Sequence, residues 1–269
     1  MLTRLLPAAF RVLRLGRLLR FPLFERLYLA ALFAYKRYHE DSFAGLAKRW
    51  PELFRGGHIL DVGGNVGYTA SVFAELVEPP FVVHTFEPEP VNVARLRKVL
   101  ARRELDQRVV PVQAAVGDRC GEIELVLNES HPGDHRIATD RPVGRAITVP
   151  LLSLDEYAMR NGVRPIVFVK IDVQGFELAV SRGMEGILAS QPRIAVAFEF
   201  DESAALAYGW DLETILTFYE KRGFSLHALH RSGILSDPRR ASRSGGERGY
   251  FDILAVRGES PPSRTQFGE

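Results

Sequence analysis

The residues best suited to chemistry lie in a glycine-rich turn that follows a short apolar run. The segment reads Ile59-Leu60-Asp61-Val62-Gly63-Gly64-Asn65-Val66-Gly67. It predicts a buried strand, a tight turn and the start of a helix. The absence of Cβ atoms at Gly63, Gly64 and Gly67 would let the backbone approach a ligand closely. The Asp61 carboxylate and the N–H groups at the helix start would border that ligand.

The spacing of these residues argues against two common nucleotide motifs. It is D-x-G-x-x-x-G, not the dinucleotide-binding G-x-G-x-x-G, and no Lys-Ser/Thr pair follows the glycines as in a P-loop. For this segment alone, a strand-to-helix turn without a ligand is the alternative.

A second acidic residue follows at the distance expected for a nucleoside site. The run Phe81-Val82-Val83-His84-Thr85-Phe86 predicts a strand and is followed by Glu87 and Pro88. A carboxylate at the end of the second strand can accept both ribose hydroxyls of an adenosine. Glu87 alone could be a charge at a helix N-terminus, but the glycine turn upstream favours nucleoside binding.

Five segments extend this pattern along the chain: DVGGNVGYTAS, FEPEPVNVARL, AAVGD, VPLLSLDEY and FVKIDVQGFELAVSRGM. Together they resemble the successive motifs of the FkbM family of S-adenosylmethionine-dependent methyltransferases, over roughly residues 57–200. The sequence departs from the family at Gly64, where Ala is usual, and at Gln174, where Glu is frequent. The resemblance implies S-adenosylmethionine as the cofactor, bound along Asp61–Gly67 and at Glu87 and Pro88.

The expected fold is α/β, the Rossmann-like fold of class I methyltransferases. It has a mostly parallel seven-stranded sheet with an antiparallel last strand, helices on both faces and an N-terminal helical extension. Alternation of strands and helices supports the parallel sheet. Expected strands cover 58–62, 81–87, 109–115, 121–128, 146–150, 165–172, 193–200, 224–230 and 250–257. Expected helices cover 24–39, 42–48, 67–77, 89–104, 153–161, 176–190 and 212–222, and a mobile loop covers 231–249.

We expect three regions: the extension over 1–55, the cofactor-binding domain over 56–257 and a disordered tail over 258–269. Residues 1–50 hold ten Lys or Arg against three Asp or Glu. Helical spacing over 8–21 places Arg11, Arg14 and Arg17 opposite an apolar face. This helix would either pack on the domain or face an anionic membrane or a partner.

Other site candidates follow from the carboxyl edge of the sheet, where ligands bind in open α/β folds. Asp172 ends the fourth strand and would contact the methionine end of the cofactor or the acceptor, or else cap a helix. Gln113 and Ala114 end the third strand and are expected to border the adenine. Glu199 ends the fifth strand and is expected in the acceptor site.

An irregular segment, Gly133-Asp134-His135-Arg136, supplies candidates for proton transfer. His135 can act as a general base near neutral pH, and Asp134 could orient it. Arg136 could hold a hydroxylated or anionic acceptor. A solvent loop is the alternative, and Asp134 or Asp172 would be the next candidates for the base.

Composition bounds the remaining possibilities. The chain has 269 residues, 46% hydrophobic residues and a net charge of +2. The single cysteine, Cys120, excludes an intrachain disulfide and suits a cytoplasmic location. No metal-ligand spacing is found, no nucleic-acid partner is expected, and no apolar run reaches the ~18–20 residues of a membrane span.

The expected activity is O-methylation of a hydroxyl on a glycan, polyketide or similar metabolite, an acceptor class implied by the family resemblance alone. Two other classes stay open. One is a nucleotide-dependent oxidoreductase, and the other is a non-catalytic, membrane-associated scaffold with a methyltransferase-like fold.

Overall fold

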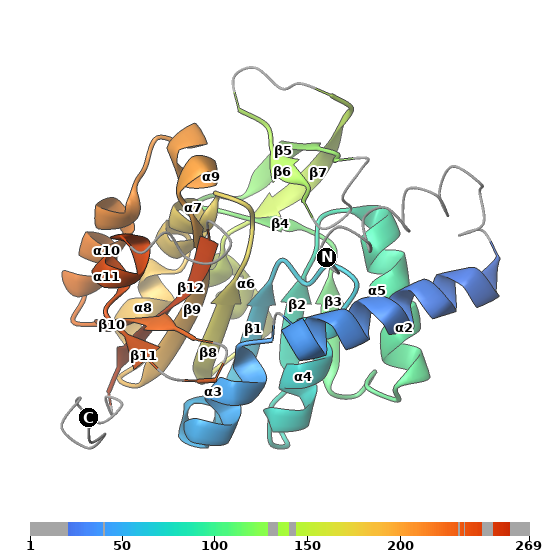
Figure 1. Ribbon diagram of the computed structural model, residues 1–269, viewed down its shortest axis with the longest axis horizontal. Helices are drawn as coiled ribbons and strands as arrows, with labels where there is room; N and C mark the ends of the chain where they lie inside the picture. The colour runs from blue at the N-terminus through green and yellow to red at the C-terminus, as the bar shows by residue number, and fades with distance from the viewer. Residues whose placement is uncertain are drawn as a thin grey trace.

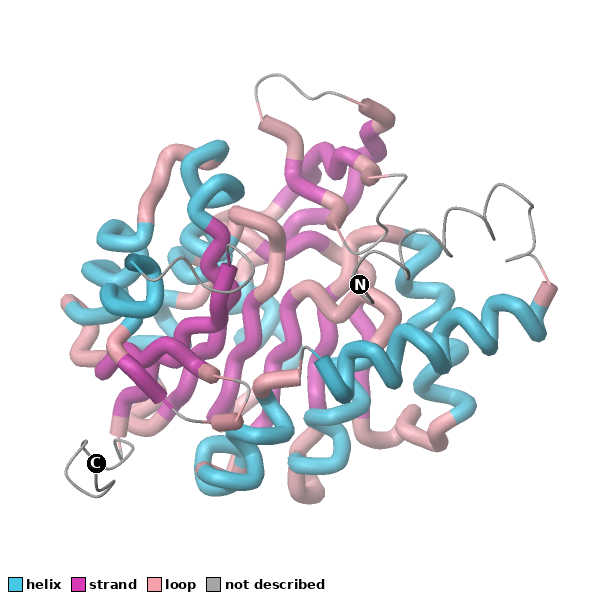
Figure 2. Tube along the Cα trace, viewed as in Figure 1, coloured by secondary structure: helices cyan, strands magenta, loops and turns pink. Residues whose placement is uncertain are grey.

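A mixed eight-stranded sheet forms the centre of the computed structural model, and helices cover both of its faces (Figures 1 and 2). The structure describes residues 21–39, 41–128, 134–139, 144–230, 232–233, 235–243 and 250–258. Residues 8–20 of the helix predicted over 8–21, Gly133, and residues 259–269 of the tail predicted over 258–269 lie outside these ranges.

The main sheet has the expected parallel core, and its strand order was not part of the prediction. In spatial order the strands are β11(Leu235–Ser236), β10(Ser225–Leu229), β12(Tyr250–Arg257), β9(Ile194–Asp201), β8(Ile166–Ile171), β1(His58–Val62), β2(Val83–Phe86) and β3(Val109–Val112). Pairing is parallel from β9 to β3, whereas β12 is antiparallel to both β9 and β10. The two-residue β11 adds an edge strand that the sequence did not predict.

A small second sheet lies above the main sheet in Figure 1. Its order is β4(Ala115–Val116), β7(Ala146–Leu152), β5(Gly121–Val126) and β6(Arg136–Ile137). The alternating pattern over 121–128 predicted a strand here, and β5 confirms it. The two residues of β6 come from the segment expected to carry the acceptor site.

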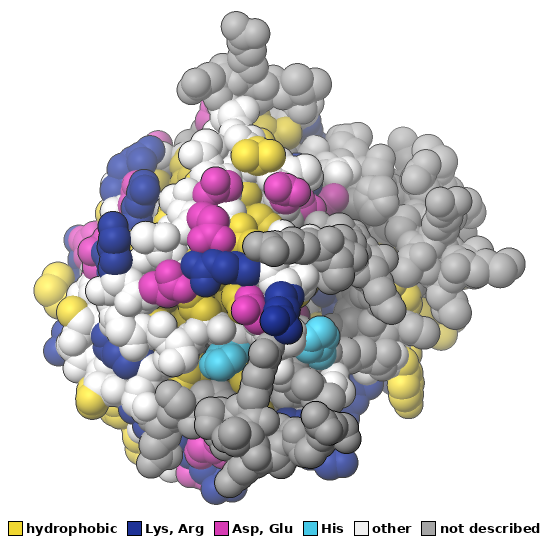
Figure 3. Space-filling model, turned by 60° about the vertical axis from the view of Figure 1, so that its left-hand side comes forward, with side chains coloured by type: hydrophobic (Ala, Val, Ile, Leu, Met, Phe, Trp, Pro, Cys, Tyr) yellow, Lys and Arg dark blue, Asp and Glu magenta, His cyan; other side chains and the backbone are white. Residues whose placement is uncertain are grey.

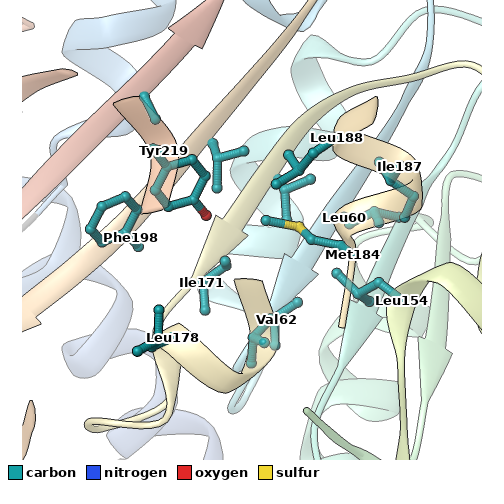
Figure 4. Packing of buried hydrophobic residues seen from close by; sticks show 14 of the residues in the cluster. Leu60, Val62, Leu154, Ile171, Leu178, Met184, Ile187, Leu188, Phe198 and Tyr219 are labelled. Carbon is teal, nitrogen blue, oxygen red and sulfur yellow. The ribbon is translucent and has the colours of Figure 1, made fainter. Parts of the chain in front are cut away.

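One face of the main sheet packs against helices from the second half of the chain. These are α6(Leu154–Asn161), α7(Glu177–Arg182), α8(Glu185–Ser190), α9(Glu202–Ala207) and α10(Leu212–Glu220). Figure 4 shows Leu60, Val62 and Ile171 of the strands facing Leu178 and Leu188 of the helices. Every second residue of the buried strands points to this side, which leaves the alternate residues for the other face.

The opposite face is covered by the first half of the chain. The elements are α2(Pro22–His39), α3(Phe43–Arg49), η2(Pro51–Phe54), α4(Tyr68–Leu76) and α5(Pro90–Arg102). Phe43 and Phe54 share a buried cluster with Phe73 and Phe168. Part of the predicted extension therefore belongs to the core, and its boundary at residue 55 stays a prediction. No helix in the described ranges is both long and apolar enough to cross a bilayer.

Two local expectations were wrong. The single helix predicted over 176–190 is interrupted at Gly183, which lies against the backbone of Gly117, and the Asp155 carboxylate then accepts the N–H groups of Gly186 and Ile187 to begin α8. The predicted loop over 231–249 contains β11 and α11(Pro238–Arg243) among its described residues.

Three polar side chains form a network on the α6 side of β1 and β2. His84 Nδ1 lies 2.9 Å from the Tyr157 hydroxyl, and His84 Nε2 lies 3.3 Å from His58 Nδ1. Burial, with a further contribution from His58, lowers the pKa of His84 to about 4. Neither histidine lines the cavity described below, and the two rings together with Tyr157 link β1, β2 and α6.

This lowered pKa predicts acid sensitivity of the fold. The unfolded chain takes up a proton near pH 6.5, whereas folded His84 resists protonation, so stability is lost as the pH falls from about 6.5 towards 4. When the pH is lowered from 7.5 to 5, His84 should reduce the free energy of unfolding of the wild type by about 2 kcal/mol. Urea unfolding of wild type and His84→Gln at both pH values measures this difference. An equal pH dependence in the two proteins would contradict it.

Candidate active site

A row of polar side chains crosses the main sheet near the carboxyl ends of its parallel strands. Asp61 of β1 is paired in register with Thr85 of β2 and Lys170 of β8, and Glu199 of β9 is paired with Asp252 of β12. Strand alternation directs these side chains away from the α6–α10 face, because their neighbours in sequence fill that core. Charged groups are thereby concentrated on the face that α2 to α5 cover.

Lys170 lies at the centre of this row. Its Nζ is 3.5 Å from Asp61 Oδ1 and 3.4 Å from Asp172 Oδ2, and it donates to the Gly63 carbonyl at 3.1 Å. Burial alone would lower the pKa of Lys170, but the carboxylates of Asp172 and Asp61 outweigh it and raise the pKa. The side chain is thus a buried ammonium that connects β8 to the glycine turn.

The carboxylates around Lys170 differ in their proton affinity. Burial raises the pKa of Asp61 despite Lys170. For Asp172, the opposing effect of burial is exceeded by Lys170 and Lys36, which lower its pKa. Burial and the neighbouring charges of Asp172 and Asp252 hold the pKa of Glu199 well above its ordinary value. Asp172 is therefore the more acidic of the two carboxyl groups, and Glu199 holds a proton more strongly.

The glycine turn has no room for side chains. A Cβ on Gly63, whose φ is +82°, would lie 1.9 Å from the Asp172 carbonyl oxygen. A Cβ on Gly64 would lie 2.0 Å from Thr85 Oγ1, which donates to Asp61 Oδ2 at 3.0 Å. Gly64, where the family usually has Ala, therefore leaves room for the Thr85 hydroxyl in this chain.

Glu87 faces the turn from the end of β2. Its Oε2 accepts the N–H of Asn65 at 2.9 Å, and its Oε1 accepts the N–H of Glu89 at 3.0 Å. Burial raises the pKa of Glu87 to about 7, although these N–H groups and the Asn92 amide favour the ionised form. The carboxylate is fixed in orientation and still borders open space.

That space is a cavity of about 460 Å³, within the range of small-molecule sites. Its wall contains residues from the glycine turn, the ends of β2, β8 and β9, the small sheet and α2. Most predicted site residues line it: Gly63, Gly64, Asn65, Glu87, Pro88, Ala114, Asp134, His135, Arg136, Asp172 and Glu199. The residues predicted from the sequence are therefore far apart in the chain but close together around one cavity.

Three predicted residues lie outside this wall. Asp61 is fully buried behind the turn beside Lys170. Gly67 begins α4, where a Cβ would lie 2.5 Å from Leu96 Cδ1, so it permits helix packing. Gln113 is exposed and does not line the cavity, so the structure gives no support to its expected adenine contact.

The small sheet brings the Asp134–Arg136 segment to the cavity. His135 Nδ1 accepts the backbone N–H of Asn128 at 3.0 Å. A neutral ring with this bond carries its proton on Nε2, so that nitrogen donates rather than accepts. His135 as the general base stays a prediction, and this geometry favours a role in holding an acceptor oxygen.

Gln174 joins the two carboxylates at the sheet edge. Its Nε2 donates to Asp172 Oδ1 at 3.2 Å and to Glu199 Oε1 at 3.3 Å. Glu177 supports the same loop by accepting the N–H groups of Val173 and Gly175, and burial raises its pKa to about 7. A glutamine at 174 thus avoids a further carboxylate next to two others.

Sequence reasoning missed Lys170 and the residues that α2 contributes to the cavity, Tyr28, Leu32 and Lys36. A lysine inside the apolar run Val167-Phe168-Val169-Lys170-Ile171 was a usable signal, because a charge is rarely buried without partners. No comparable signal identified the inner face of α2, since that depends on tertiary packing.

These residues fit the cofactor that the sequence implied. The turn lets backbone approach a ligand, and the oriented Glu87 carboxylate can accept ribose hydroxyls beside it. Asp172 offers an ionised carboxylate to an ammonium group. Within the described ranges, no group of His, Cys, Asp and Glu side chains is arranged to hold a metal ion.

Comparison with known proteins agrees with a site for S-adenosylmethionine. The model of the methyltransferase FkbM domain matches residues 61–226. "31-O-demethyl-FK506 methyltransferase FkbM" of Streptomyces tacrolimicus is 30% identical over 186 residues, which cover 58% of this chain and 70% of that protein. "Hexuronic acid methyltransferase AglP" of Haloferax volcanii is 30% identical over 136 residues, covering 49% and 52%.

A solved structure shares the fold. The crystal structure of methyltransferase FkbM from Methylobacillus flagellatus aligns with a TM-score of 0.52 at 15% identity, covering 86% of this chain and 52% of that one. The sequence alternatives of an oxidoreductase and a non-catalytic scaffold gain no support from these matches. The family match spans the glycine turn, Glu87, Asp172 and Glu199, and the chain belongs to the FkbM family of S-adenosylmethionine-dependent methyltransferases.

Proposed function

We propose that the protein transfers a methyl group to a hydroxyl oxygen of a glycan, polyketide or similar small metabolite. The observation that carries the proposal is that one cavity holds both the nucleoside-binding elements and the polar group of Asp134, His135, Arg136 and Glu199. The names of the two relatives support an oxygen acceptor, because a 31-O-demethyl compound and a hexuronic acid both offer hydroxyl groups.

A nucleic-acid acceptor has less support. On the face shown in Figure 3, acidic and basic side chains of the described residues are interspersed. Such a face differs from the continuous basic surface typical of nucleic-acid binding.

Bound S-adenosylmethionine supplies a methyl group on a positively charged sulfur, so the protein has to position and deprotonate the acceptor. We assign proton removal to Glu199, which lines the cavity and whose raised pKa makes its carboxylate a stronger base than that of Asp172. Glu199 would take up the hydroxyl proton as the acceptor oxygen receives the methyl group that the cofactor would supply. His135 Nε2 and Arg136 would donate to other acceptor oxygens.

The first test of this proposal is transfer of a labelled methyl group to extracts and to a panel of polyols, sugar acids and macrolides. Labelled products with a methyl ether support O-methylation. Label found only on nitrogen, carbon or nucleic acid would overturn it.

The role of Glu199 predicts a rate effect without a cofactor-binding effect. Glu199→Gln should lower the transfer rate roughly 10²–10⁴-fold, because general-base assistance is lost. Binding of S-adenosylhomocysteine should stay within about twofold of wild type, since Glu199 is not needed for it. His135→Ala serves as the comparison. Wild-type turnover in Glu199→Gln together with a steep loss in His135→Ala would contradict the assignment of the base to Glu199.

Glu87 predicts pH-dependent cofactor affinity. Its ionised form accepts two ribose hydroxyls, so affinity for S-adenosylmethionine should fall up to about tenfold from pH 8 to pH 6. Glu87→Ala should weaken binding by about 1.5–3 kcal/mol, or roughly ten- to a hundredfold. Glu87→Gln should bind weakly with little pH dependence. Calorimetry on the three proteins checks this, and wild-type affinity in Glu87→Ala would exclude the ribose contact.

We also propose that the N-terminal region contacts an anionic membrane surface. Phe21, which directly precedes α2, and Leu23 and Leu27 of α2 are 59%, 64% and 58% exposed. Residues 1–20 directly precede them and contain five arginines but no acidic residue. Apolar side chains beside a basic segment are typical of interfacial binding.

Flotation with vesicles tests this contact. The full chain should float with anionic vesicles at low salt, because each basic residue near such a surface contributes about 1 kcal/mol. Flotation should decline at high salt, with neutral vesicles and in Leu23→Ser/Leu27→Ser. Equal recovery of the full chain and a truncation without residues 1–21 would exclude the membrane role.

A further inference from the structure

The inner face of α2 completes the cavity from outside the region that the family model matches. Tyr28, Leu32 and Lys36 line the cavity, and they precede the matched residues 61–226. Their spacing of four residues places them in line along one side of the helix. The wall that they form faces the glycine turn and Asp172, which line the same space.

Several contacts hold α2 in a fixed register over the domain. The buried Glu25 carboxylate pairs with Arg95 at 3.4 Å and with Lys98 at 3.0 Å on α5. Further along the helix, the ring of Phe33 meets Tyr68 edge-on, with centroids 5.3 Å apart.

Beyond the end of α2, the chain is tied to α3 and α4. Asp41 accepts the Tyr68 hydroxyl at 2.8 Å and the N–H groups of Phe43 and Ala44 at 3.0 Å. A helix held at both ends can present its side chains at defined positions, as a binding site requires.

Lys36 lines the same cavity as Asp172. The positive charge of Lys36 helps to lower the pKa of the Asp172 carboxyl. Three other cations line the cavity. Arg95 of α5 pairs with Glu25 of α2, Arg136 belongs to the small sheet, and Lys170 already pairs with Asp61 and Asp172 within the sheet.

The amino-acid end of the cofactor is a zwitterion, with an α-ammonium and an α-carboxylate. An ionised carboxylate and an ammonium group that face one cavity match those two charges. We propose that Lys36 binds the α-carboxylate of S-adenosylmethionine while Asp172 binds its α-ammonium, so that α2 is part of the cofactor site. The inference rests on the proposed function, and it assigns Tyr28 and Leu32 to the adenosine end of the same wall.

A comparison of two cofactor fragments tests the role of Lys36. S-adenosylhomocysteine carries the amino-acid end, whereas 5′-methylthioadenosine lacks it. Lys36→Met should lower the affinity for S-adenosylhomocysteine at least about tenfold, because a charge-assisted hydrogen bond is lost. It should leave the affinity for 5′-methylthioadenosine within about twofold of wild type. Lys36→Arg should recover part of the lost affinity for S-adenosylhomocysteine. Lys48→Met, which changes an exposed side chain of α3, is the matched control and should bind both compounds as wild type does.

Tyr28→Ala provides a second readout, since it should weaken both compounds alike. The inference is overturned if Lys36→Met binds S-adenosylhomocysteine normally, or if it weakens both compounds equally. A wild-type chain that bound neither compound would instead contradict the cofactor site as a whole, which separates the two failures. Thermal unfolding of each variant confirms that the comparison is made on folded protein.

Discussion

The buried ammonium of Lys170 is the interaction on which the site depends. A charge removed from water costs several kcal/mol unless partners replace its hydration. Here the partners are Asp61, Asp172 and the Gly63 carbonyl, which belong to the central strand, the adjacent strand end and the glycine turn. The same contacts that stabilise the charge therefore hold the turn against β8, where the Gly63 backbone touches the Asp172 carbonyl.

Charge balance around this ammonium sets the chemistry of the other carboxylates. One lysine cannot neutralise all the acidic residues of the polar row, so their carboxyl groups differ in pKa. Asp172 stays ionised beside Lys170 and Lys36, whereas the pKa of Glu199 is raised by burial and by its acidic neighbours. Gln174 bridges Asp172 and Glu199 without adding charge. A glutamate at this position would push the proton affinity of the cluster higher still.

Much of the fold was predictable because its strands and helices depend on local sequence patterns. Apolar runs bounded by glycine and proline predicted the main strands. The Ser153 hydroxyl oxygen accepts the N–H of Glu156 at the start of α6, which is likewise a local interaction. Glu87 was found because its role follows from its place at a strand end. Lys170 and the inner face of α2 were missed because their roles arise from side-chain alternation and from contacts between distant segments. The break between α7 and α8 likewise depends on Gly117 and Asp155, which lie far away in sequence.

The cavity wall combines a rigid sheet edge with two additions. The turn, Glu87 and Asp172 come from the central strands and the loops that follow them, whose geometry is fixed by buried pairing. The small sheet contributes Asp134, His135 and Arg136, and α2 contributes Tyr28, Leu32 and Lys36. Since methyl transfer requires the same cofactor for every acceptor, the sheet edge can stay constant while the small sheet changes. Acceptor selectivity is therefore expected to reside in the β5–β6 region, where substitutions do not disturb the Lys170 cluster.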